Sequence, residues 1–259
     1  MTLKIHNVTA KISSAISLVD IEVEVEVEAG SVTVVIGPNG AGKTSLLRAI
    51  CSDLPFSEGV ITLNDKVISQ WDAQSKATLL AILPQRSSLE FPFTVEEVVT
   101  MGRIPHSTSN SQNRDIVNKA LALVDCNHLI ARSFINLSGG EKQRVQLARV
   151  AAQVWDAVDA GDRCLILDEP TASLDLAHQE MVVRMFEFFA AQGVAILVVL
   201  HDLNLAAKCA SQILVLKDGR SAALGKPETV LTEEMLKDVF SISAKVISNP
   251  VNGKPMVVT

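Results

Sequence analysis

Residues 31–44 read SVTVVIGPNGAGKT, an apolar run followed directly by glycine-rich sequence. The run Ser31–Ile36 is rich in β-branched residues, which is typical of a strand buried on both faces of a sheet. Residues 37–44 fit the pattern GxxxxGK followed by Ser or Thr, and a helical pattern covers Thr44–Ile50. A buried strand, a glycine-rich turn and a helix in this order predict a loop that binds phosphate groups.

The residue types in this loop suit phosphate binding. Glycine allows backbone N–H groups to turn inward toward phosphate oxygens. Lys43 can place a positive charge beside the β- and γ-phosphates, the Thr44 hydroxyl can ligate Mg²⁺, and the helix N-terminus adds its dipole. We therefore expect a nucleotide to contact Gly37, Pro38, Asn39, Gly40, Ala41, Gly42, Lys43, Thr44 and Ser45.

Two further apolar runs, Cys164–Leu167 and Ala195–Leu200, predict more buried strands. Asp168 and Glu169 follow the first run, at the end of a strand where open α/β sheets bind their ligands. Asp168 can reach Mg²⁺ directly or through water, and Glu169 can polarise a water for in-line attack on the γ-phosphorus. His201 ends the second run, so we expect it to lie beside these carboxylates.

The remaining patterns divide the chain. Residues 21–28 alternate between apolar and acidic, which predicts an antiparallel strand with one face in water. Residues 86–155 hold helical patterns and no long strand-like run, which predicts a helical insertion. The expected fold class is α/β, with a parallel sheet core and antiparallel strands in residues 1–85 and 156–240. Residues 241–259 form a C-terminal tail for which the sequence predicts no chemistry.

Composition excludes several classes of protein. The chain has 259 residues, 48% of them hydrophobic, and can bury a substantial core. Its formal net charge of −6 argues against nucleic acid as a partner. The longest apolar stretch, Val194–Leu200, is seven residues, whereas a membrane helix needs about 20, and the amino terminus has no secretory pattern. No CxxC pair occurs, so we expect reduced thiols at Cys51, Cys126, Cys164 and Cys209.

A second glycine motif decides among the remaining classes. Residues 137–141, LSGGE, open a helix with Ser138 as a candidate N-cap and bare backbone amides. One nucleotide needs only one such anion cradle, and this is a second. In order and spacing, residues 1–240 resemble the ATP-binding subunits of ABC transporters, through residues 37–44, 137–141, 165–169, Ser173-Leu174-Asp175 and His201.

The resemblance implies a P-loop NTPase fold of the RecA-like type, with ATP and Mg²⁺ as cofactors. Ser138, Gly139 and Gly140 match the signature motif, which faces the γ-phosphate held by the opposite subunit. Asp175 matches the aspartate of the D-loop at the dimer interface. Glu141 stands where the family often has glutamine.

The resemblance also assigns roles in catalysis. Gln85 matches the glutamine that touches the metal or the attacking water and links the site to the membrane subunit. His201 matches the histidine that contacts the γ-phosphate. The expected catalytic residues are therefore Glu169, His201 and Gln85, and the expected metal ligands are Thr44, Gln85 and Asp168.

The partners implied are a second copy of the chain in the ATP-bound state, two polytopic permease subunits and, indirectly, a substrate-binding protein. The implied location is the cytoplasmic face of a bacterial inner membrane, as a peripheral protein. Residues 83–99, 101–103, 105–106, 155–163 and 174–179 resemble the hemin importer branch. Importers of ferric siderophores and cobalamin have similar strings, so the same ATPase role for those cargoes stays open. Phe91 and Phe93 either anchor a permease helix or belong to the core of the insertion.

One position departs from the family pattern. The family places an aromatic residue that stacks on adenine upstream of the phosphate loop. Here that position is Ala10, and the chain has no tyrosine. Because a base–aromatic stack contributes about 1–3 kcal/mol, we expect weak selectivity for ATP over GTP.

Other classes share the phosphate loop. Small P-loop kinases and GTPases lack the LSGGE element and carry a base-reading motif or an acceptor lid, neither of which is visible. A regulatory nucleotide-binding module would not need Asp168, Glu169 and His201 together. Non-transport ABC ATPases usually have two cassettes or a long coiled coil, for which 259 residues leave no room. A non-transport ATPase stays as a second alternative.

Overall fold

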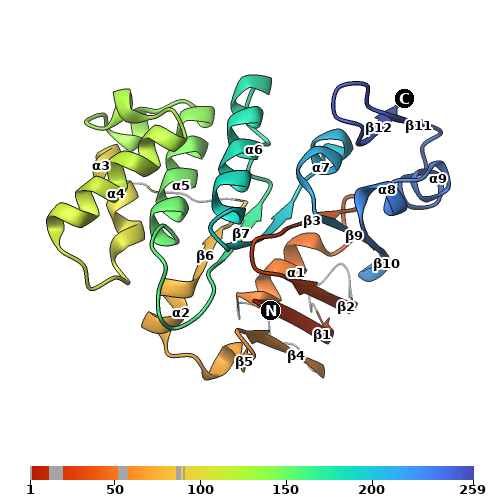
Figure 1. Ribbon diagram of the computed structural model, residues 1–259, viewed down its shortest axis with the longest axis horizontal. Coiled ribbons are helices and arrows are strands. Elements are labelled where there is room, and N and C mark those ends of the chain that lie inside the picture. Colours follow the sequence, from red (N-terminus) through yellow and green to blue (C-terminus); the bar gives the residue numbers. More distant parts are fainter. Residues whose placement is uncertain (1, 12–19, 52–57, 86–88, 90) are drawn as a thin grey trace.

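A long mixed β-sheet runs through the molecule (Figure 1). The computed structural model describes residues 2–11, 20–51, 58–85, 89 and 91–259. In this part of the chain the sheet has ten strands in the order β5-β4-β1-β2-β10-β9-β3-β8-β7-β6. Strands far apart in sequence therefore lie side by side, and the expected α/β class is confirmed.

Five strands form the parallel part of the sheet. Every residue of β3, β7 and β8 is buried, because helices and the antiparallel strands cover the two faces. This burial explains why the sequence of these strands is continuously apolar and does not alternate. The strands are β3 (Val32–Ile36), β6 (Leu80–Leu83), β7 (Cys164–Asp168), β8 (Ala195–Val199) and β9 (Gln212–Lys217).

The register of these strands places the predicted motifs together. Strand β8 lies between β3 and β7, and Val199 pairs with both Val35 and Asp168. The carboxyl ends of all three strands therefore meet at one edge of the sheet. The phosphate loop, the Asp168-Glu169 pair and His201 all begin at that edge.

Antiparallel strands form the other part of the sheet. Residues 21–28 lie largely in β2, where the valines are buried and the glutamates exposed, as the alternating pattern predicts. Strands β9 and β10 form a hairpin, with Asp218 and Gly219 at φ 49° and 80° in its turn. These strands are β1 (Leu3–Lys11), β2 (Asp20–Val27), β4 (Glu58–Leu63), β5 (Lys66–Val67) and β10 (Arg220–Gly225).

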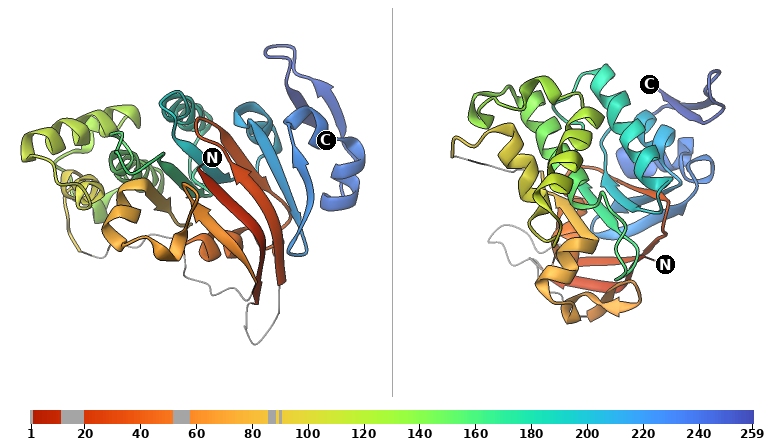
Figure 2. Two further views of the ribbon diagram at one scale, coloured as in Figure 1. Left: turned by 60° about the horizontal axis from the view of Figure 1, so that its bottom comes forward. Right: turned by 60° about the vertical axis from the view of Figure 1, so that its left-hand side comes forward.

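Helices cover the sheet, and a group of them lies beyond one of its ends (Figures 1 and 2). Helices α3, α4 and α5 gather at the end where β6 lies and occupy the expected insertion, whose limits at residues 86 and 155 stay a prediction. Helix α6 begins at Leu176, because the Asp175 side chain caps it. The helices are α1 (Lys43–Ile50), α2 (Ala73–Leu79), α3 (Val95–Thr100), α4 (Asn110–Leu123), α5 (Gly139–Gln153), α6 (Leu176–Ala190), α7 (Leu203–Cys209), α8 (Pro227–Val230) and α9 (Glu233–Phe240).

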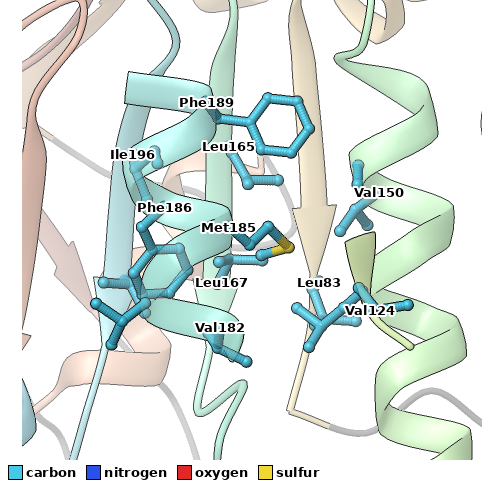
Figure 3. Close-up of a cluster of buried hydrophobic side chains, with 14 of the residues drawn as sticks. Leu83, Val124, Val150, Leu165, Leu167, Val182, Met185, Phe186, Phe189 and Ile196 are labelled. Atoms are coloured by element: carbon cyan, nitrogen blue, oxygen red, sulfur yellow. The ribbon is translucent and has the colours of Figure 1, made fainter. Parts of the chain in front are cut away.

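The larger hydrophobic cluster lies between the parallel strands and α5 and α6 (Figure 3). Phe186 and Phe189 of α6 are almost completely buried and point toward the sheet. The Trp155 ring packs against Phe188 and, edge to face, against Phe189 at 5.8 Å between centroids. This aromatic contact joins the segment after α5 to α6.

Buried basic side chains fix the end of α5. The Arg103 guanidinium donates to the Ala152 carbonyl at 2.6 Å, and Arg163 donates to the Val154 carbonyl at 2.7 Å. Gln153, the last residue of α5, donates to the Ala77 carbonyl at 2.7 Å. The last carbonyls of a helix have no partner within it, so the two arginines satisfy those of α5. The Gln153 hydrogen bond ties the end of α5 to the residues before β6.

The tail after α9 forms a structure that the sequence does not predict. It folds into a hairpin of β11 (Lys245–Ser248) and β12 (Pro255–Val258), which lies beside α7. Among the described residues, no helix has the length and apolar character that crossing a membrane requires. The Ala10 side chain, where we expect an adenine-stacking aromatic to be missing, lies outside the described residues.

Candidate active site

The phosphate loop joins β3 to α1, as the sequence predicts. Glycine is required at Gly37 because a Cβ there would lie 2.3 Å from the Leu216 carbonyl oxygen. Gly42 caps α1 in the left-handed conformation, at φ 98°. The loop therefore brings exposed backbone to the start of the helix, pressed against β9.

The Lys43 side chain curls back over this loop. Its ammonium donates to the Gly37 and Pro38 carbonyls at 2.8 and 2.9 Å. Burial lowers the pKa of Lys43, while the nearby charges of Glu169 and Asp168 oppose that shift. A desolvated cation that donates to carbonyl groups gains strongly from an anion placed beside it.

Asp168 ends β7 and is buried, with 3% of its surface exposed. Burial raises the pKa of its carboxyl group, and a hydrogen bond from the Thr44 hydroxyl opposes the shift. Its Oδ1 has no hydrogen-bond partner within the described part of the chain. An orphaned buried carboxylate oxygen beside a hydroxyl fits a hard divalent cation that takes oxygen ligands.

The described residues contain no cluster of three or more His, Cys, Asp or Glu that could enclose a metal. The predicted ligand set of Thr44, Gln85 and Asp168 includes only one such residue. So small a number of protein ligands suits Mg²⁺, which keeps several waters and takes its other oxygens from substrate phosphates.

The Glu169 side chain is held by two residues that follow the ends of two other strands. Its Oε2 accepts a hydrogen bond from Gln85 Nε2 at 2.9 Å, just after β6. Its Oε1 is hydrogen-bonded to Nε2 of His201, just after β8. Glu169 has φ 51°, an uncommon conformation for a residue other than glycine. The carboxylate is thus fixed in place by an amide and an imidazole.

A cavity of about 280 Å³ joins these parts. Asp168 does not line it but reaches it through Thr44. Gly37 and Pro38 also lie outside the lining and hold the Lys43 ammonium. The lining residues are Asn39, Gly40, Ala41, Gly42, Lys43, Thr44, Ser45, Gln85, Glu169 and His201.

The other predicted residues lie outside this cavity. Ser138 caps α5, and its backbone N–H donates to Glu141 Oε2 at 2.8 Å in a capping box that lowers the pKa of Glu141. A Cβ on Gly139 would meet open space. Asp175 caps α6 and accepts from the backbone N–H of His178 at 2.9 Å. These residues form a second exposed group, separate from the phosphate loop.

Sequence reasoning missed a link between the two groups. Gln143, one turn into α5, donates through Nε2 to the Pro170 carbonyl at 3.2 Å. Pro170 directly follows Glu169, so α5 contacts the segment that carries this carboxylate. The available signal was the spacing, since Gln143 lies four residues after Gly139 on the same helix face.

A sequence profile of the ABC transporter family matches residues 21–172. The chain belongs to this family. It is therefore an ATPase of the transporter type, with the P-loop NTPase fold.

Curated relatives are similar over most of the chain. A hemin import ATP-binding protein, HmuV, of Pseudomonas entomophila is 49% identical over 89% of each chain. The protein of the same name from Pseudomonas fluorescens strain Pf0-1 is 45% identical over 99% of each chain.

Solved structures agree with the fold. A metal-chelate type ABC transporter in an inward-facing conformation superimposes with a TM-score of 0.80, at 24% identity, over 99% of this chain and 96% of that one. A dimeric bacterial ABC transporter cassette gives 0.75 at 23% identity, over 86% and 98% of the two chains.

Asp168→Asn should raise the thermal unfolding temperature of the protein at pH 7 by a few degrees when no nucleotide or Mg²⁺ is added. Burial raises the pKa of Asp168 in the folded protein. The neutral carboxyl group of Asp168 suits the buried site, so its contribution to folding stability is fully present below the unfolded pKa. This contribution is lost as the pH rises through the folded pKa and the group ionises, whereas asparagine stays neutral. The advantage of the variant should shrink toward pH 4, near the unfolded value of about 3.9.

The matched control is Asp238→Asn, an exposed residue of α9. It should leave the unfolding temperature unchanged at both pH values. Added ATP and Mg²⁺ should stabilise the wild type more than Asp168→Asn. Equal stabilisation of the two proteins would contradict a ligand role for Asp168.

Proposed function

We propose that this chain is the ATP-hydrolysing subunit that energises hemin uptake through a membrane permease. The observation that carries the cargo assignment is the 45–49% identity to hemin import ATP-binding proteins over most of the chain. The site geometry supports the ATPase role, because Glu169 is held between Gln85 and His201 at the phosphate-loop cavity.

Binding of ATP begins at the loop. The Lys43 ammonium leaves the Gly37 and Pro38 carbonyls for the β- and γ-phosphates, to which the loop N–H groups also donate. Thr44, Asp168 and Gln85 would hold Mg²⁺, which supplies charge neutralisation on the phosphate oxygens when bound. His201 is positioned to contact the γ-phosphate.

Glu169 acts as the general base. Its carboxylate accepts a proton from the attacking water as the water oxygen bonds in line to the γ-phosphorus, while the bond from that phosphorus to the β–γ bridging oxygen breaks and ADP leaves. Gln85 and His201 keep the two oxygens of Glu169 in place, so little reorganisation is needed at the moment of reaction.

The second group of residues acts in a dimer. Ser138, Gly139 and Asp175 are exposed and lie outside the phosphate-loop cavity of their own chain. In a head-to-tail pair of chains, the α5 N-terminus of one subunit reaches the γ-phosphate bound by the other. Two ATP molecules then hold the dimer closed, and hydrolysis opens it.

Phe91 is the candidate anchor for the permease. Its side chain is 69% exposed, and the centroid of its ring lies 6.1 Å from that of the Phe93 ring. Phe93 is half-buried and packs against the larger hydrophobic cluster, so it links the exposed ring of Phe91 to the core. We place the protein at the cytoplasmic face of the inner membrane, with two permease subunits and, through them, a substrate-binding protein.

Uptake by the complex reconstituted with its permease tests the cargo. Hemin, a ferric siderophore and cobalamin are compared in the same vesicles, with and without ATP. We expect ATP-dependent accumulation of hemin above the other two. Accumulation of a siderophore or cobalamin instead would assign the same ATPase to that cargo, and the absence of any uptake would favour a non-transport role.

Glu169→Gln should lower kcat for ATP hydrolysis by about two to three orders of magnitude, because the amide cannot accept the proton from water. ATP binding should persist and the closed dimer should accumulate in gel filtration. Glu187→Gln on the exposed face of α6 is the control and should hydrolyse ATP normally. Normal turnover by Glu169→Gln would rule out the general-base role.

Phe91→Ala should reduce uptake by the reconstituted complex about tenfold while basal hydrolysis stays within about twofold, since the ring contacts the permease and not the nucleotide. Val251→Ala, which also trims an exposed apolar side chain, should change neither rate. If Phe91→Ala transports at the wild-type rate, the docking assignment is wrong.

A further inference from the structure

The C-terminal hairpin binds the helix that follows His201. Asn204, the second residue of α7, donates from Nδ2 to the Val257 carbonyl at 3.1 Å. The Val257 N–H donates back to Asn204 Oδ1 at 2.7 Å. The side-chain amide thus pairs with β12 as a neighbouring strand would, and the Val257 side chain is buried.

The hairpin also reaches the other end of α7. The Lys254 ammonium donates to the Lys208 carbonyl at 2.6 Å, in the last turn of the helix. A cation at this position satisfies a terminal carbonyl and interacts favourably with the helix dipole. The hairpin therefore holds α7 at both of its ends.

Neither element is expected to be stable alone. Helix α7 has seven residues, and isolated helices shorter than about 12–15 residues are marginal in water. An isolated two-stranded hairpin is marginal as well. Packing of β12 on α7 stabilises each through the other, in addition to the buried contacts that α7 makes with the sheet.

The position of α7 bears directly on His201. On one side, the Leu200 N–H donates to the Val35 carbonyl, so the sheet fixes the chain before the histidine. On the other side, Asp202 caps α7 and accepts from the backbone N–H groups of Asn204 and Leu205 at 2.8 and 3.0 Å. Two residues therefore span the distance between a rigid strand and a helix that depends on the hairpin.

We propose that the C-terminal hairpin positions His201 against Glu169, with Asn204 as the positioning residue that carries the contact. This inference rests on the ATPase role of the chain and not on the identity of its cargo. Loosening the hairpin shifts α7, and His201 then no longer holds the Glu169 carboxylate. Nucleotide binding persists, because the phosphate loop lies on β3 and α1.

Two substitutions in the full-length chain test the proposal. Asn204→Ala removes both hydrogen bonds, and Val257→Asp places a charge in the buried contact. Each should lower kcat for ATP hydrolysis about tenfold, since small displacements of catalytic groups have effects of this size, while KM for ATP stays within about twofold. Circular dichroism at the assay temperature verifies that each variant is folded.

The control is Val251→Asp, the same chemical change in the same hairpin at a side chain that is 91% exposed. It should retain the wild-type kcat. The double variant Asn204→Ala with Val257→Asp should lose no more activity than the worse single variant, because both act through one contact. A kcat for Asn204→Ala equal to that of the control, a rise in KM without loss of kcat, or multiplicative losses in the double variant would overturn the proposal.

Failure of the cargo assignment is distinguishable from failure of this inference. A wild-type complex that hydrolyses ATP but transports no hemin removes the cargo assignment and leaves the role of the hairpin intact. If the wild-type complex takes up hemin and Asn204→Ala hydrolyses ATP at the wild-type rate, the cargo assignment stands and the role of the hairpin is removed.

Discussion

The parallel pairing of β3, β8 and β7 is the constraint on which the rest of the molecule depends. These strands are buried on both faces, and apart from Thr33 and the terminal Asp168 their side chains are apolar. Only the edge where they end can hold charged groups. The register aligns these ends, and as a result the phosphate loop, Glu169 and His201 line one cavity although they come from distant parts of the chain, and Asp168 lies just behind it.

The same burial makes the residues of the site lower the stability of the folded protein. The Asp168 carboxylate has an unpartnered oxygen in buried surroundings, Lys43 is desolvated, and Glu169 adopts a left-handed backbone conformation. Each feature opposes folding. The desolvated Lys43 favours an anionic ligand, and the Asp168 oxygen favours a cation. The continuous apolar packing of the strands and of α6 supplies the stability that offsets them.

Much of this arrangement could be predicted from the sequence. The strands and the phosphate loop depend on short-range patterns, namely β-branched runs and glycines at fixed spacing. The position of His201 at the end of a buried strand predicts that it lies beside the carboxylates, and its hydrogen bond to Glu169 agrees with that. The contact of Gln85 with Glu169 depends on the strand order, which sequence periodicity does not encode. The tail was unpredictable for a similar reason, because β12 is stabilised by an amide on α7, about 50 residues earlier in the chain.

The aromatic contact between Trp155 and α6 gives this protein an intrinsic optical label. The chain has two tryptophans and no tyrosine, so its near-ultraviolet emission arises almost entirely from two indoles. Trp71 lies beneath the Lys66 ammonium on the antiparallel side, whereas Trp155 sits where the insertion meets the sheet. A change in fluorescence that persists when Trp71 is replaced by phenylalanine would therefore report the environment of a single junction between α5 and α6.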